Sequence, residues 1–314
     1  MNRPYYSVND FLKEKYGEKV YKIALDAGMT CPNRDGTLGT RGCIFCSVGG
    51  SGDFAVPRTS SITEQLQAGL SLFRSKQVGR LFIAYFQSYT NTYAPVERLH
   101  TLYDEALRQD CIVGISIATR PDCISPEIIH LLTTLQKQYP DKFIWIELGL
   151  QTIHEQTAIL IRRGYPLPVF EQAVIDLQNA NIPIIVHVIL GLPGEDKGMM
   201  LETCSYLNRL SVFGIKLQLL HVLKNTDLAL LYEEEKCPTL ELHSYLDLVI
   251  SALEILSPDM VIHRLTGDGP KELLIAPLWS LNKRNVLNSL HKELKNRNTW
   301  QGRRYHDTGT INTL

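Results

Sequence analysis

Short apolar runs rich in β-branched residues alternate along most of the chain with longer segments of helical period. The runs are nearly continuous, as in Ile182-Pro-Ile-Ile-Val-His-Val-Ile-Leu190, which is typical of strands in a sheet that helices cover. They predict strands at 21–26, 81–86, 113–118, 143–150, 183–190 and 214–220. The intervening segments predict helices at 63–76, with Ser60 or Ser61 as its cap, and at 95–109, 125–138, 154–162, 168–180 and 198–210.

This order of elements predicts an α/β fold. Six strand-then-helix units imply parallel strands joined by right-handed crossovers. Six units are two short of a closed eight-unit barrel. Both an open (β/α)6 barrel and a doubly wound sheet therefore fit the pattern.

The pattern changes after residue 221. A helix is expected at 239–256, a short strand at 260–264 and a helix rich in Asn and Lys at 282–297. We therefore expect three parts, which are an N-terminal extension at 1–20, a core domain at 21–220 and a C-terminal α+β extension at 221–314. The extension covers or continues the main layer and is a candidate for binding substrate.

Composition narrows the class of protein. The chain has 314 residues, of which 44% are apolar and 21% charged, and its formal net charge is −1. This balance excludes a globally basic nucleic-acid protein and a disordered chain of low hydrophobicity. No apolar run approaches the roughly 20 residues of a membrane helix, and the first residues lack the apolar core of a signal peptide. A soluble cytoplasmic protein without membrane contact is expected.

Three of the seven cysteines, Cys31, Cys43 and Cys46, share the loop after the first strand in the spacing C-x11-C-x2-C. Unliganded cysteines seldom crowd an exposed, glycine-rich loop, because burial is their usual state. A [4Fe–4S] cluster held by three thiolates would leave one iron open for another ligand. A structural zinc site would need a fourth ligand, and a thioredoxin-like dithiol would use only Cys43 and Cys46. The pattern alone leaves all three open.

The three cysteines, the aromatic Phe45 just before the last of them and the six strand-then-helix units together resemble the radical SAM superfamily. The resemblance covers about residues 20–220 and implies the open, partial TIM barrel of that superfamily. The wide gap between the first two cysteines is similar to that of its YhcC/YtqA-like branch. The branch-level match runs through almost the whole chain and includes Tyr85-Phe-Gln-Ser-Tyr-Thr-Asn-Thr-Tyr93 and His263-Arg-Leu-Thr-Gly-Asp268.

The resemblance implies an enzyme with one [4Fe–4S] cluster on Cys31, Cys43 and Cys46 and with S-adenosylmethionine on the open iron. One electron, from a donor such as flavodoxin or ferredoxin, would cleave the sulfonium. The resulting 5′-deoxyadenosyl radical would abstract hydrogen from the substrate, while the protein orients the reactants and excludes water. The other four cysteines include no close pair, so a single cluster is expected.

Contacts to S-adenosylmethionine are also implied at the ends of strands. By resemblance, the polar residues after the second strand meet the methionyl amine, Gln151 approaches the cofactor and Arg163 pairs with its carboxylate. His187 corresponds to a position that faces the ribose, and the turn after the fifth strand backs the adenine. The expected contacts are Phe45, Gln87, Ser88, Gln151, Arg163, His187, Gly191 and Leu192.

Basic and aromatic residues interleave near the C-terminus, a composition that suits a phosphate backbone and stacked bases. They are Lys283, Arg284, Lys292, Lys295, Arg297, Arg303 and Arg304, with Trp279, Trp300 and Tyr305. A merely solvated helix face explains these charges equally well. The catalytic domain of the branch also resembles the tRNA-modifying lineages of the superfamily, which implies a tRNA nucleoside as one candidate substrate. A small molecule or peptide is the rival. Two other functions stay open, which are a zinc-stabilised nucleic-acid-binding protein and a thiol oxidoreductase using Cys43 and Cys46.

Overall fold

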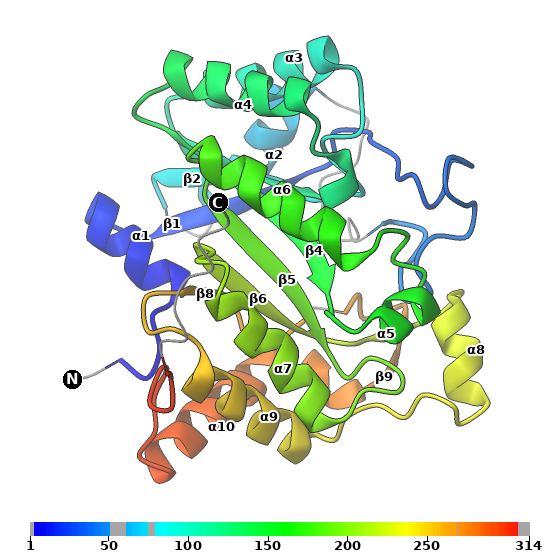
Figure 1. The fold of residues 1–314 in the computed structure, drawn as a ribbon. Coiled ribbons are helices and arrows are strands. Elements are labelled where there is room, and N and C mark those ends of the chain that lie inside the picture. The colour runs from blue at the N-terminus through cyan, green and yellow to red at the C-terminus, as the bar shows by residue number, and fades with distance from the viewer. Residues whose placement is uncertain (1–2, 51–60, 75–78, 268, 307–314) are drawn as a thin grey trace.

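Seven parallel strands form one curled sheet in the computed structural model, which describes residues 3–50, 61–74, 79–267 and 269–306 (Figure 1). The strands follow one another in chain order: β1 (Val20–Leu25), β2 (Leu81–Phe86), β3 (Ile112–Thr119), β4 (Phe143–Gln151), β5 (Ile184–Leu190), β6 (Gly214–Leu219) and β8 (Val261–Arg264). A doubly wound sheet would reverse its strand order at a switch point. The observed order therefore excludes that alternative and confirms the open barrel.

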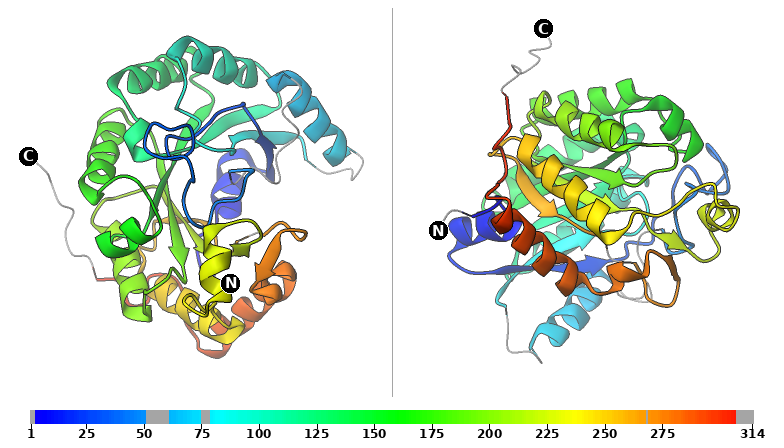
Figure 2. Two further views of the ribbon diagram at one scale, coloured as in Figure 1. Left: turned by 90° about the vertical axis from the view of Figure 1, so that its right-hand side faces the viewer. Right: turned by 90° about the horizontal axis from the view of Figure 1, so that it is seen from below.

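Helices cover the outer face of the curled sheet, and the left view of Figure 2 looks into the barrel past the carboxyl ends of the strands. The covering helices are α2 (Ile62–Arg74), α3 (Val96–Leu107), α4 (Pro126–Gln138), α6 (Leu167–Asn179), α7 (Lys197–Asn208) and α9 (Leu242–Ile255). Three further helices are α5 (Glu155–Leu160), α8 (Asp227–Glu233), which lies beside β7, and α10 (Lys283–Asn296), which packs on α9. Short 3-10 turns lie at Pro121–Cys123 and Leu278–Leu281. Within the described residues, no helix combines the length and apolarity needed to cross a bilayer.

The helix boundaries follow capping chemistry. The Ser61 hydroxyl accepts a hydrogen bond from the Glu64 backbone N–H, and the Glu64 carboxylate accepts one from the Ser61 backbone N–H. The two hydrogen bonds form a capping box for α2. Ser125 caps α4 in the same way through the N–H of Ile128. The expected cap at Ser61 is thus confirmed, while Ser60 lies outside the described residues.

An N-terminal helix closes the bottom of the barrel. This helix, α1 (Val8–Tyr16), follows a single parallel bridge between Ser7 and Ile262 of β8, and it packs against both β1 and β8 at the two edges of the open sheet. Its Phe11 meets Trp145 and Phe213 in an aromatic layer below the strand centres. Residues 3–19 therefore seal the barrel end opposite the cysteine loop, and the division of the chain at residue 20 stays a prediction.

The C-terminal segment completes the sheet rather than only covering it. β8, at the place of the short strand expected at 260–264, pairs in parallel with β6 and becomes the seventh strand of the sheet. A separate antiparallel pair, β7 (Val222–Leu223) and β9 (Leu274–Ala276), lies beyond β6. Helix α9 packs on α7 and α10 packs on α9, which continues the outer helical layer (Figure 1). The division of the chain at residue 221 stays a prediction.

Candidate active site at the open end of the barrel

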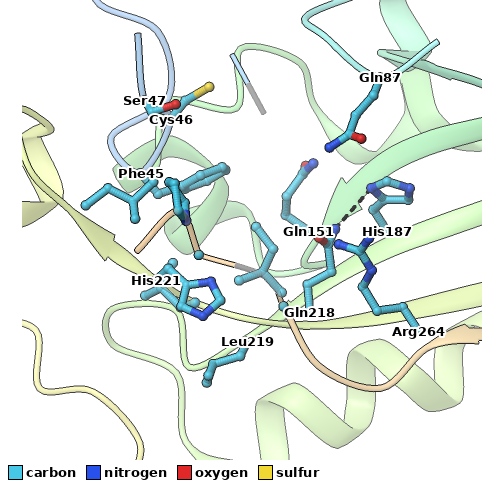
Figure 3. Close-up of a pocket in the computed structure, with 16 residues that line it drawn as sticks. Phe45, Cys46, Ser47, Gln87, Gln151, His187, Gln218, Leu219, His221 and Arg264 are labelled. Carbon is cyan, nitrogen blue, oxygen red and sulfur yellow. Dashed lines mark hydrogen bonds between the residues drawn. The ribbon is translucent and has the colours of Figure 1, made fainter. Parts of the chain in front are cut away.

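One cavity lies between the cysteine loop and the carboxyl ends of the strands, and we call it the barrel cavity. Cys31, Cys43 and Cys46 line one end of it. Toward β6 and β8 it is lined by Gln87, Gln151, His187, Gln218 and Arg264, which come from five different strands or strand ends and point toward one another (Figure 3).

The part of the cysteine loop that carries Cys43 and Cys46 is held by the turn after α5 and by α8. Within it, the Cys46 N–H donates to the Cys43 carbonyl at 3.1 Å. Ile44, between these two cysteines, donates its N–H to the Ile161 carbonyl and accepts from the Leu228 N–H at the start of α8. Helix α8 also supplies Asp227, which forms ion pairs with Arg41 and Arg162. The C-terminal segment therefore helps to hold the loop that carries the thiols.

The three thiols fit a [4Fe–4S] cluster. All seven cysteines lie within the described residues and none forms a disulfide. Cys31, Cys43 and Cys46 line one cavity, where each thiolate could bind a different iron of the cluster. Burial and the neighbouring Cys46 raise the pKa of Cys43 to about 12, so binding iron would release a proton from this thiol.

The predicted cofactor contacts divide into two groups. Phe45, Gln87, Gln151, Arg163 and His187 line the barrel cavity together with the three cysteines, and this brings residues from the loop, β4, β5 and the turn after α5 to one place. The remaining three, Ser88, Gly191 and Leu192, are not among the residues that line it. All eight assignments stay predictions.

Two of that second group face other parts of the protein. Leu192 is buried in an apolar cluster with Ile189 and Leu220. A Cβ on Gly191, at φ +92, would come within 3.2 Å of the Leu240 side chain, so this glycine makes room for a leucine behind the turn. The sequence pattern does not distinguish such a packing glycine from one that approaches a ligand.

Gln151 is placed by a strained backbone. It has a left-handed φ of +62, rare for a residue with a side chain, at an irregularity where β4 pairs with β5. A Cβ on Gly149 would lie 2.5 Å from the Gln151 amide nitrogen, so only glycine leaves space for this amide. Backbone strain of this kind concentrates at functional sites, and here it turns a carboxamide into the barrel cavity.

Arg163 is almost fully buried and holds the backbone around it. Its guanidinium donates to the carbonyls of Leu150, Thr152 and Tyr165, at distances of 2.6–3.2 Å. The remaining contact, from Nη2 to the Glu155 carboxylate, is longer at 3.4 Å. Arg163 therefore fixes the turn after β4 in addition to lining the cavity.

A buried charge network forms the floor of the cavity, and the sequence analysis did not find it. The Glu147 carboxylate, with a fully buried side chain, accepts hydrogen bonds from Ser116 (2.6 Å), Lys22 (3.3 Å), His187 (2.7 Å) and Lys216. Burial alone would raise the pKa of Glu147, but the charges of Lys216 and Lys22 outweigh it and hold that pKa well below its usual range.

The network draws on β1, β3, β4, β5 and β6, and Lys216 also donates to the Tyr85 hydroxyl of β2 at 3.1 Å. The sequence contained a sign of this network, because several otherwise apolar strands have a charged or hydroxyl residue in their middle. Parallel pairing places these positions on the same inner layer.

His187 is held in one tautomer by its neighbours. Gln218 donates its amide N–H to His187 Nδ1 at 3.0 Å (Figure 3). His187 Nε2 therefore carries the proton and donates to Glu147. Burial and the charge of Lys216 lower the pKa of His187 to about 4, in spite of the hydrogen bond to Glu147. The imidazole is therefore neutral at pH 7.

This pKa predicts a pH-dependent stability. The pKa of His187 is about 4 in the folded chain and about 6.5 in the unfolded chain. As the pH falls from 6.5 towards 4, the unfolded chain binds a proton at His187 that the folded chain does not, so the folded state loses stability over this range. Between pH 7.5 and 5 we expect the native protein to lose about 2 kcal/mol more unfolding free energy than the His187→Gln variant. Urea unfolding of both proteins measures this, and equal losses would contradict the assignment.

The basic residues near the C-terminus do not form one surface. Lys283, at the start of α10, lines a groove with Arg264 and Lys271 that continues from the barrel cavity. Arg297 instead pairs with Asp247 and Glu293. The remaining members of the set include Arg304, which pairs with Glu254, and Arg303, which packs over the exposed Trp300. Only one end of α10 faces the open end of the barrel.

Comparisons with known proteins agree with this arrangement. The family model described as "Radical SAM superfamily" matches residues 36–207, and the "Radical_SAM C-terminal domain" matches residues 212–296. The chain is 46% identical over 299 residues to YtqA of Bacillus subtilis (95% of this chain, 92% of that protein). It is 36% identical over 273 residues to YhcC of Escherichia coli (87% and 86%).

A solved structure supports the fold alone. Elp3 from the archaeon Methanocaldococcus infernus matches with a TM-score of 0.67 at 15% identity, over 90% of this chain and 64% of that one. The family matches decide among the functions that the cysteine pattern left open, in favour of an enzyme that uses a [4Fe–4S] cluster and S-adenosylmethionine. On these matches, the chain belongs to the radical SAM superfamily, in the same branch as YtqA and YhcC.

Proposed function

We propose that this enzyme holds its cluster through Cys31, Cys43 and Cys46 and acts on a tRNA nucleoside. The observation that carries the proposal is the barrel cavity, where the three thiols face a set of polar side chains from the strand ends. When bound there, the cluster and S-adenosylmethionine supply one-electron cleavage of the sulfonium and removal of a hydrogen atom from the substrate. A small protein such as flavodoxin or ferredoxin is the proposed electron donor.

The chain's own residues bind and orient the reactants. Gln87 and Gln151 offer both N–H donors and carbonyl acceptors beside the cysteines, which suits the amino and carboxylate groups of S-adenosylmethionine. Phe45, between two of the cysteines in the chain, shields that end of the cavity from water. Arg163 would meet the cofactor carboxylate through its Nη2, whose contact to the half-exposed Glu155 is long and replaceable.

The far end of the cavity suits the edge of a nucleobase. Gln218 donates one amide N–H to His187. The carbonyl oxygen of the same amide points away from His187 and is an acceptor. Arg264 beside it offers donors only. A base displaced from a single-stranded RNA loop presents both kinds of group on its edges. The groove from Arg264 through Lys271 to Lys283 would carry the attached phosphates.

Charge reversal tests RNA binding. The triple variant Lys271→Glu, Lys283→Glu and Arg284→Glu changes the basic residues at and beside this groove. We expect it to bind tRNA at least about tenfold more weakly at moderate salt, with a shallower dependence on salt concentration. The control is a second triple variant, Lys292→Glu, Lys295→Glu and Arg303→Glu. Its residues lie further along α10 or after it, and this helix has 14 residues and a length of about 21 Å. Equal effects of both triples would contradict the groove.

The substrate itself is identified in cells. Mass spectrometry of tRNA nucleosides from cells with and without the protein should reveal one modified nucleoside that disappears when the gene is deleted. The same nucleoside should stay absent when only a Cys43→Ala chain is supplied. Identical nucleoside profiles would remove tRNA and leave a small molecule or peptide as the substrate.

A further inference from the structure

Two consecutive residues of the cysteine loop aim nitrogen donors at the cysteines. Asn33 is buried, and its amide donates to Cys43 Sγ at 3.5 Å and to the Arg162 carbonyl at 2.8 Å. Arg34 follows it, and its Nη2 donates to the carbonyls of Cys46 (2.9 Å) and Ser47 (2.6 Å). Both residues sit inside the gap between the first and second cysteines.

Arg34 lines the barrel cavity with all three cysteines. A Cβ on Gly42, at φ +73, would lie 2.9 Å from the Arg34 Nε, so this glycine provides the space for the guanidinium. Arginine keeps its charge in proteins, so the guanidinium is a permanent positive charge in the cavity that the three thiols line.

We propose that Asn33 and Arg34 set the reduction potential of the cluster. The inference rests on the proposed ligation by Cys31, Cys43 and Cys46. Reduction adds one electron from a low-potential one-electron donor and breaks no bond, and it increases the negative charge on the cluster and its thiolates. An N–H donor at one sulfur and a cation in the same cavity both stabilise that extra charge, so both raise the potential.

The test compares the holoenzyme with Arg34→Gln, which keeps an N–H donor and removes the charge. Redox titration with dithionite and mediators, followed by electron paramagnetic resonance of the reduced cluster, gives the potential without any turnover. We expect the ratio of reduced to oxidised cluster at a fixed applied potential to fall about tenfold. For a one-electron couple this is a shift of about 59 mV to lower potential.

Arg98→Gln is the matched control. Arg98 is exposed and also holds this loop through two carbonyls, those of Ala27 and Gly28 at 3.1 Å each. Its loss should leave the potential unchanged, so an equal shift in both variants would reduce Arg34 to a loop-holding role and overturn the proposal. An unchanged potential in an iron-loaded Arg34→Gln protein would also overturn it.

A third variant covers the case in which Arg34→Gln fails to retain iron. Arg34→Lys keeps the positive charge but loses the fork that serves two carbonyls. A potential close to that of the native protein supports the proposal, whereas a fall of about 59 mV would assign the effect to the fork and overturn it. The failures are distinguishable, because native protein that binds no iron would contradict the cysteine assignment itself. A native protein that binds its cluster, with a reduction potential that does not change when Arg34 is replaced, would contradict only this inference.

Discussion

The Cys43→Ala variant is expected to lose its [4Fe–4S] cluster and with it all reductive cleavage of S-adenosylmethionine. Three thiolates are the smallest set that leaves a single iron open, and the loop offers no replacement for Cys43, whose sulfur is held between Asn33 and the Arg162 carbonyl. Anaerobically reconstituted native protein should contain about four irons per chain and release 5′-deoxyadenosine. The variant should contain few and release none above background.

Cys123→Ala is the matched control for this experiment. Cys123 is a half-buried thiol like Cys43, but it lines a different hollow with Tyr93 and Ile128. Its removal should change neither iron content nor cleavage. Iron retained in full by Cys43→Ala, or lost equally from Cys123→Ala, would refute the assignment of the three ligands.

The strand pattern and the cysteine spacing were the most informative parts of the sequence. The pattern placed β2 at the observed residues and the other five predicted strands within one or two residues of the observed ends. This is because buried parallel strands read as continuous apolar runs. The seventh strand was expected at 260–264, but whether it joins the main sheet was left open, since β8 is only four residues long. Local sequence does not show with which neighbour so short a strand pairs.

The floor of the cavity shows where sequence reasoning ends. Lys22 lies 125 residues from Glu147, and Lys216 lies 69 residues from it. Each of the three alone reads as a stray polar position in an apolar strand. Only the register of the strands shows that Lys22 and Lys216 contact the same carboxylate. Arg34 was missed for a similar reason, because its guanidinium reaches back across the loop to Cys46 and Ser47.

Replacing Glu147 with alanine is expected to cost about 3–5 kcal/mol of unfolding free energy at pH 7.5. The side chain of Lys216 is only 3% exposed and lies against this carboxylate, and Lys22 lies 3.3 Å away. Removing the carboxylate leaves the Lys216 ammonium buried without a partner charge, and the Lys22 ammonium loses its ion pair. Urea unfolding of metal-free native and variant protein gives the difference, and a loss below about 1 kcal/mol would contradict the ion pair.

The double variant Glu147→Leu with Lys216→Met separates stability from function. Apolar residues of similar size often replace a buried ion pair without loss of stability, and Lys22, with a side chain 27% exposed, can turn to water. We therefore expect the double variant to regain most of the stability that Glu147→Ala loses. His187 would lose its acceptor, and Gln218 would no longer be oriented through it. If the double variant folds stably and retains its cluster but does not modify its substrate, the buried charges serve to orient the polar residues above them, and stability alone does not explain their presence.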